Sequence, residues 1–182
     1  MYKPYTGVGS RETPEDIQNV MTNLAMKLSW SGGYTLRSGG ADGADYAFWR
    51  GACQAYSEVM AEIYIPWNGF NNCGTPNPNI IVAKYLSNWK EAEYIAQGIH
   101  PAWDKLSRGA KALHTRNIYQ VLGKDLDSPS KFLVCYAKET KDGNISGGTR
   151  TAYVLAKEYN IPCFNLIRED HLKRVQECLK EK

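Results

Sequence analysis

A chain of 182 residues, 43% hydrophobic and 23% charged, has the length and composition of one globular domain with a sizeable core. A formal net charge of +3 allows a phosphate-bearing partner without demanding one, and no apolar run approaches membrane-spanning length. The five cysteines are widely spread and form no Cys-x-x-Cys pair, which argues against a disulfide framework or a zinc site. We therefore expect a single cytoplasmic domain over residues 1–182, with no metal, no cofactor and no membrane partner.

The first half of the chain alternates strand-like and helical patterns. Residues 5–8 predict a strand, and Thr13 is expected to cap a helix whose apolar residues recur at helical spacing from 17 to 28. A second strand is expected at 34–37, a helix with a stripe of small residues at 44–55, and a third strand at 59–65. Residues 66–79 form a long polar loop, of a length that is usually functional or disordered, and its Trp67 and Phe70 make disorder a poor explanation.

The second half continues the alternation. Helices are expected at 80–97, 107–122, 149–159 and 169–180, and strands at 131–137 and 161–166. The apolar run at 132–136 is typical of a buried parallel strand. This order predicts an α/β, Rossmann-like three-layer fold, in which a parallel sheet carries helices on both faces.

Three glycine-bearing turns each follow a predicted strand. We call residues 7–11 the first turn, 38–45 the second turn and 146–152 the third turn. Glycine lets the backbone approach a ligand closely, and a helix that starts after such a turn directs free N–H groups at it. Turns of this kind gather at the carboxyl edge of a parallel sheet. The sequence therefore predicts one crevice for an anionic, nucleotide-like ligand.

The first and second turns supply different chemical groups. In the first turn, Gly9 and Ser10 lie beside Arg11, whose guanidinium is suited to clamping a phosphate. The second turn offers backbone and hydroxyl donors from Ser38, Gly39 and Gly40. It also holds two carboxylates, which either accept hydrogen bonds from ribose hydroxyls or a base amine or, for the first of them, cap the next helix. These carboxylates belong to Asp42 and Asp45.

The third turn has the composition of a phosphate cradle. Ser146 and Thr149 supply hydroxyls, Gly147 and Gly148 supply exposed N–H groups, and Arg150 supplies charge. No Gly-Lys-Ser/Thr follows, and no turn shows Gly-x-Gly-x-x-Gly with a later acid, so neither a P-loop nor a dinucleotide dehydrogenase is indicated.

The helix predicted at 107–122 holds further polar residues. His114 and Asn117 share a face, while Arg116 points elsewhere, beside Gln120. Spacing alone favours a solvated face here, and no local spacing identifies a catalytic pair, so no catalytic residue is assigned.

The three turns together resemble the SLOG superfamily, which groups the DNA-processing protein A (Smf) proteins with the Lonely Guy phosphoribohydrolases. Gly9-Ser10-Arg11 resembles the opening Gly-Ser-Arg of the DNA-processing branch. The second turn, Ser-Gly-Gly-Ala-Asp-Gly-Ala-Asp, is similar to its Ser-Gly-x-Ala-x-Gly-x-Asp turn, and residues 148–152 resemble its Gly-Ser-x-x-Thr-Ala turn. The resemblance covers about 5–166 and implies a Rossmann-like fold, a ligand at the three turns and a homo-oligomer.

Departures from the two branches bear on function. The segment His114-Thr115-Arg116-Asn117 is similar to the one that bears a ligand-binding arginine in Lonely Guy enzymes, but Tyr153 stands where their catalytic glutamate is expected. Loss of that carboxylate argues against hydrolysis. The DNA-processing branch binds single-stranded DNA, yet no dense lysine or arginine stripe is visible in this sequence.

The resulting hypothesis is a protein that binds a nucleotide-derived ligand for sensing or sequestration. Relatives implied by the resemblance bind NAD-derived (ADP-ribose-type) or cyclic signalling nucleotides in phage defence, and a stand-alone bacterial or phage copy would act as a sponge. Two alternatives remain open, a nucleotide N-glycosidase of the Lonely Guy type and a single-stranded DNA-binding mediator.

Overall fold

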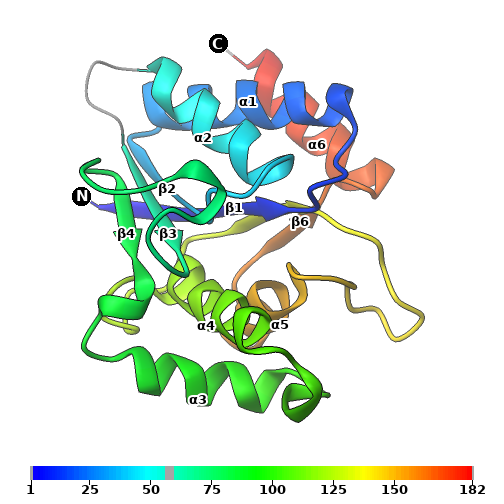
Figure 1. Cartoon of the computed structure of the whole chain (residues 1–182). Coiled ribbons are helices and arrows are strands. Elements are labelled where there is room, and N and C mark those ends of the chain that lie inside the picture. The colour runs from blue at the N-terminus through cyan, green and yellow to red at the C-terminus, as the bar shows by residue number, and fades with distance from the viewer. Residues whose placement is uncertain (1, 56–59, 182) are drawn as a thin grey trace.

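The computed structural model describes residues 2–55 and 60–181 (Figure 1). Its strands form one parallel sheet in the order β4-β3-β2-β1-β5-β6. Their bounds are β1 Lys3–Gly9, β2 Tyr34–Ser38, β3 Ala61–Ile65, β4 Ile80–Val82, β5 Leu133–Tyr136 and β6 Cys163–Asn165. The helices are α1 Glu15–Trp30, α2 Ala44–Ala55, α3 Trp89–Ile99, α4 Arg108–Leu122, α5 Arg150–Glu158 and α6 Glu169–Lys180. None of these helices within the described ranges has both the length and the apolar character needed to cross a bilayer.

Helices cover both faces of the sheet, so the predicted Rossmann-like three-layer fold is confirmed. In Figure 1, α1, α2 and α6 lie above the sheet, α4 and α5 lie below it, and α3 packs on the far side of α4. Strand β1 separates two apolar cores, because its alternate side chains point to opposite faces. Tyr5 belongs to the core under α1 and α2 with Phe48, whereas Val8 belongs to the core under α4 and α5 with Tyr119.

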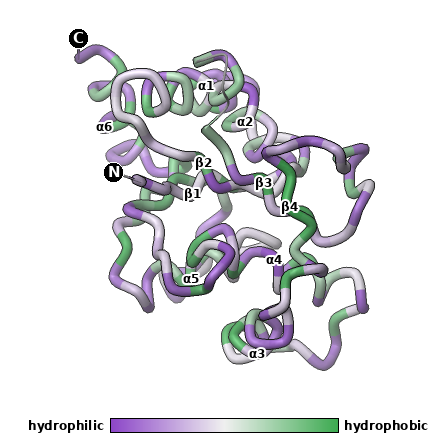
Figure 2. The backbone as a smooth tube through the Cα atoms, turned by 90° about the vertical axis from the view of Figure 1, so that its left-hand side faces the viewer, coloured by the Kyte–Doolittle hydropathy of each residue, from purple (hydrophilic) through white to green (hydrophobic). Residues whose placement is uncertain are grey.

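The helix predicted at 80–97 is wrong at its beginning. Residues Ile80–Val82 form the edge strand β4, paired with β3 in the register Ile63↔Ile80, and a short 3-10 turn precedes α3. The Ile-Ile-Val sequence of β4 is hydrophobic along its length (Figure 2). Three β-branched residues beside an unpaired strand edge favour the sheet, and this tertiary pairing overrides a spacing that also fits a helix.

Two smaller expectations change as well. Thr13 does not cap α1, because Pro14 occupies the N-cap position and the Thr13 hydroxyl donates to Ser10 O over 2.6 Å. That hydrogen bond stabilises the first turn instead. The predicted start of the third strand, Val59, lies outside the described residues, and the described part of that strand begins at Ala61.

Close packing of α1 on α2 depends on one glycine. A Cβ atom built on Gly51 would lie 2.1 Å from the backbone oxygen of Thr22 and 2.8 Å from the Ala25 Cβ. The small residues predicted for α2 therefore allow its close contact with α1. Gly98, near the end of α3, meets nothing within 4 Å and offers a matched position without this constraint.

We predict opposite effects of alanine at these two glycines. Gly51→Ala should lower the free energy of unfolding by about 1–3 kcal/mol, because α1 and α2 must separate. Gly98→Ala should raise it by up to about 1 kcal/mol, since alanine loses less backbone entropy in a helix. Urea unfolding of both variants checks this, and equal stabilities would contradict the packing argument.

Candidate functional site

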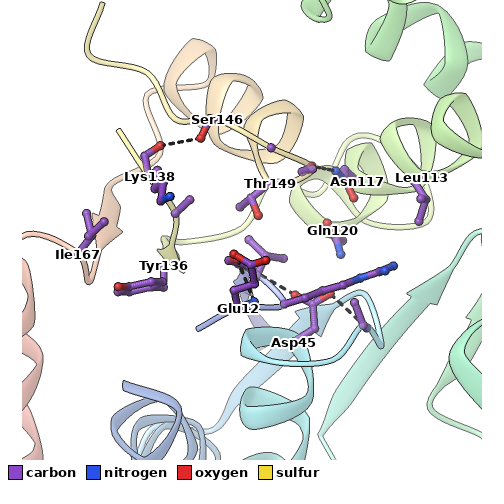
Figure 3. A pocket seen from close by; sticks show the side chains of 18 of the residues that line it. Glu12, Asp45, Leu113, Asn117, Gln120, Tyr136, Lys138, Ser146, Thr149 and Ile167 are labelled. Atoms are coloured by element: carbon purple, nitrogen blue, oxygen red, sulfur yellow. Dashed lines mark hydrogen bonds between the residues drawn. The ribbon is translucent and has the colours of Figure 1, made fainter. Parts of the chain in front are cut away.

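A pocket of about 610 Å³ opens at the carboxyl edge of β1 and β5, between the first turn, the third turn and α4 (Figure 3). Its lining includes nine of the residues that sequence reasoning selected: Gly9, Ser10, Arg11, Asp45, Arg116, Ser146, Gly147, Gly148 and Thr149. Segments from both ends of the chain therefore converge on one hollow, as the position of the turns predicted.

The first turn is held by strand β5 and keeps one donor open. Ser10 N–H donates to Tyr136 O over 2.9 Å, and the Ser10 hydroxyl accepts from Glu12 N–H over 3.1 Å. Within the described residues, the N–H of Arg11 has no hydrogen-bond partner, and the Arg11 side chain is exposed at the pocket.

Residues of the second turn hold the first turn in place through hydrogen bonds. The buried Asp45 carboxylate accepts from Gly9 N–H over 3.2 Å and from Ala41 N–H over 3.5 Å. Ala44 N–H donates to Ser10 O over 3.2 Å. Asp45 therefore places a negative charge of the protein itself at the start of α2. The N–H groups of Gly9, Ala41 and Ala44 are already hydrogen-bonded within the protein.

The other selected residues of the second turn lie outside the pocket lining. Ser38 is fully buried and donates to Gly7 O over 2.7 Å. Gly39 leaves room for an arginine, because a Cβ there would lie 1.2 Å from Arg116 Nη1. The carbonyl of Gly40 and the carboxylate of Asp42 both accept from the side chain of a loop asparagine, each over 3.1 Å.

Arg116 forms the floor of the pocket, and the interpretation of a solvated helix face is wrong. Its side chain is 6% exposed, with Nη1 3.6 Å from the Asp45 carboxylate and 3.4 Å from Tyr64 O. The guanidinium carbon lies 5.8 Å from the centre of the Phe70 ring. Within the described residues, Arg116 Nε is buried without any hydrogen-bond partner. Buried donors without a partner are rare in folded proteins, and this one is enclosed by the protein rather than exposed to the pocket.

Every residue of α4 from 114 to 122 is buried, because this helix lies between the sheet and α3. Polar side chains on it hold the neighbouring turns in place. Asn117 Nδ2 donates to Gly148 O over 2.6 Å, and His114 Nδ1 lies 2.7 Å from the Thr151 hydroxyl. Gln120, in the amide orientation that satisfies its neighbours, accepts from Gly39 N–H over 3.1 Å.

The third turn is the part of the pocket with the most open donors. Gly147 has φ +79°, a left-handed conformation that favours glycine, and Gly148 and Thr149 follow it into α5. In the described part of the chain, the N–H groups of these three residues have no hydrogen-bond partner. Arg150 lies outside the lining, since its side chain donates to Ile99 O over 3.3 Å.

Sequence reasoning missed several lining side chains, including two charged ones. Lys138 follows β5, and Glu12 follows the first turn, and both line the pocket (Figure 3). Lys138 belongs to no motif in the sequence. Glu12 could have been identified as a pocket residue from its position directly after Arg11. With Asp45 paired to Arg116, the charges that remain in the pocket are those of Arg11, Lys138 and Glu12.

Trp67 and Phe70, the aromatic residues of the long polar loop, line no part of this pocket. Phe70 is buried beneath Arg116. Trp67 lies at an edge-to-face angle to Phe70, 5.5 Å between ring centres, and lines a second groove of about 720 Å³ between the 66–79 loop, α3 and α4. Phe70 therefore packs against Arg116, and Trp67 packs against Phe70, so neither aromatic side chain covers the open pocket.

The site and fold define an α/β protein with a donor-rich pocket at the carboxyl edge of its sheet. No protein-family model and no curated protein sequence matches the chain. In structure it is similar to the Moco carrier protein of Chlamydomonas rheinhardtii, with a TM-score of 0.50 and 18% identity over 99% of this chain and 86% of that one. It is also similar to DNA processing protein A from Helicobacter pylori, described in a single-stranded DNA binding mode, with a TM-score of 0.40 and 16% identity over 98% and 80% of the two chains. The first similarity shows a shared fold, in agreement with the Rossmann-like fold expected from the sequence.

A buried histidine next to the third turn ties the stability of this region to pH. Burial, with smaller contributions from the neighbouring His100 and Arg116, lowers the pKa of His114 from 6.5 to about 4. The two histidine rings lie 4.5 Å apart. Below pH 6.5 the unfolded chain therefore binds a proton at this position that the folded protein does not bind.

We predict that this histidine destabilises the fold as the pH falls from about 6.5 towards 4. The loss of unfolding free energy should be on the order of 2 kcal/mol across that window. His114→Gln, which keeps a polar group near Thr151 but does not titrate, should flatten the pH dependence. Denaturant unfolding at several pH values measures both proteins, and parallel pH curves would show that His114 is not the group responsible.

Proposed function

We propose that this protein binds a phosphorylated, nucleotide-derived small molecule in the pocket, for sensing or sequestration. The observation that carries the proposal is the set of unpartnered donors around one hollow, seen over the described residues. They are the N–H groups of Gly147, Gly148 and Thr149, and the charged side chain of Arg116 also lines the hollow. Arg11 adds an exposed positive charge to the lining.

The third turn is the proposed phosphate cradle. Its three open N–H groups precede α5, and the partial positive charge at a helix N-terminus favours an anion there. Gly148 presents no side chain, and a Cβ built on it would meet nothing within 4 Å, so the backbone is open to a ligand. Ser146 and Thr149 add hydroxyl groups to the same wall.

The size of the pocket supports a ligand larger than a simple anion. A volume of about 610 Å³ falls in the range of about 300–1,000 Å³ that is usual for small-molecule sites. Inorganic phosphate would leave most of it filled with water. The name of the Moco carrier protein, which shares this fold, supports small-molecule carriage as a role for such a scaffold.

Binding without cleavage is favoured over N-glycosidic hydrolysis. Tyr153, at the position expected for the catalytic glutamate, is 8% exposed and is not part of the pocket lining. Within the proposal, the ligand is an NAD-derived or cyclic signalling nucleotide held by a cytoplasmic homo-oligomer. Native mass spectrometry after incubation with a cell extract would give the ligand mass and the subunit number together, and release of a free base on chromatography would favour an enzyme.

We predict that one substitution abolishes nucleotide binding and a second weakens it, while the fold survives in both. Gly148→Trp should fill the pocket, because its backbone is unstrained and its Cβ direction is open. Arg11→Ala should weaken binding by about 10- to 100-fold through loss of a charge-assisted hydrogen bond. Isothermal titration calorimetry with a panel of nucleotides measures both effects.

The matched controls place the same changes elsewhere. Gly98→Trp adds equal bulk at an open position on α3, and Arg108→Ala removes an exposed arginine outside the pocket. Both should bind like the unmodified protein. Unchanged affinity in Gly148→Trp and Arg11→Ala would reject this site.

A further inference from the structure

The acids expected to recognise ligand hydroxyls are not available for that task. Both oxygens of the Asp45 carboxylate are engaged, one by Gly9 N–H and the other by Ala41 N–H and Arg116. Asp42 lies outside the pocket lining and accepts from Asn71. A ligand in the pocket therefore needs another acceptor for its hydroxyl groups.

Glu12 offers the acceptor that these two acids do not. Its side chain lines the pocket, and Figure 3 shows its carboxylate directed into the hollow below Thr149. In the described part of the chain, this carboxylate has neither an ion pair nor a hydrogen bond. Its backbone is fixed, because Glu12 N–H donates to the Ser10 hydroxyl and the Thr13 hydroxyl donates to Ser10 O. These hydrogen bonds fix the backbone from which the Glu12 carboxylate extends into the pocket.

The pocket therefore has two chemically opposite parts. The third turn offers hydrogen-bond donors beside the positive charge of Arg116, whereas an ionised carboxylate only accepts hydrogen bonds. A phosphate placed against Glu12 is repelled, while a hydroxyl placed there donates to a charged acceptor. A ligand that satisfies both parts carries a phosphate at one end and hydroxyl groups a few bonds away.

We propose that Glu12 determines specificity by accepting hydrogen bonds from the hydroxyl groups of the ligand, and that the pocket thereby selects ribose-bearing phosphates over inorganic phosphate and deoxygenated analogues. The proposal rests on the proposed function, because it assumes that phosphate occupies the third turn. It assigns no role to Asp42 or Asp45 in contacting the ligand.

The test compares three probes on the whole chain: adenosine 5′-monophosphate, its 2′,3′-dideoxy analogue and inorganic phosphate. The unmodified protein should bind the monophosphate about 10- to 100-fold more tightly than the dideoxy analogue, as expected for hydrogen bonds to a charged group. Glu12→Gln should remove most of that preference and, by removing a negative charge, should raise the affinity for inorganic phosphate. Calorimetry or competition binding gives both numbers.

Glu15→Gln is the matched control, since Glu15 is an exposed acid at the N-terminal end of α1 and does not line the pocket. It should keep the selectivity of the unmodified protein. An unmodified protein that binds the ribose and dideoxy probes equally, or a Glu12→Gln variant with unchanged selectivity, would overturn the role of Glu12 while leaving phosphate binding at the third turn intact. Failure of all three probes to bind would overturn the proposed function together with it.

Discussion

A buried ion pair between Asp45 and Arg116 organises the carboxyl edge of the sheet. Burial raises the pKa of the Asp45 carboxyl, and the Arg116 guanidinium and the N–H groups of Ala41 and Gly9 oppose that rise. The pair joins α2 to α4 across the ends of β1 and β2, and the same carboxylate ties the first turn to the second turn. Buried charges are costly unless they are paired and hydrogen-bonded, so the geometry of this edge depends on both partners being present.

This arrangement makes the three turns unequal, although their sequences look alike. In the second turn, Ala41 N–H donates to the Asp45 carboxylate, and in the first turn Gly9 N–H donates to Asp45 and Ser10 N–H donates to β5. The third turn has no such internal anion, and its Gly147, Gly148 and Thr149 amides stay open within the described residues. Glycine-rich composition alone does not distinguish a turn that binds a ligand from a turn that binds its own chain. The difference lies in whether the unpartnered N–H groups line the pocket and whether an acid of the same protein lies among them.

The sequence predicted much of the fold because its signals are local. Helix α6 has the predicted bounds, and β1, β2, β5 and β6 overlap their predicted strands, since apolar runs and helical spacing are read from neighbouring residues. Edge strand β4 was missed because three residues give too little pattern and their state is decided by pairing with β3. The burial of α4 was missed for the same reason, because His114, Arg116 and Asn117 look solvated until α3 covers them and distant turns bond to them.

The site was predictable in position but not in the role of each residue. The strand–turn–helix order placed Gly9, Ser10, Arg11 and the third turn at one edge, and they line one pocket. No spacing rule could show that Asp45 faces Arg116, which lies 71 positions further along the chain, or that Gly39 is a glycine because a guanidinium passes beside it. These roles come from contacts between segments far apart in sequence, and such contacts exist only once the chain has folded.

The Nε of Arg116, unpartnered among the described residues, is a cost that the fold carries beside the pocket. Leaving a buried donor without a partner costs about 1–3 kcal/mol, and more when the group is charged. The surrounding contacts of Arg116 satisfy its Nη1, through Asp45 and Tyr64 O, but not this nitrogen, over the residues described. Fully satisfied buried networks are the rule in proteins, and exceptions gather at functional sites. Because this nitrogen is enclosed, its cost stays with the fold, and the positive charge of Arg116 is what the pocket wall offers to a bound anion.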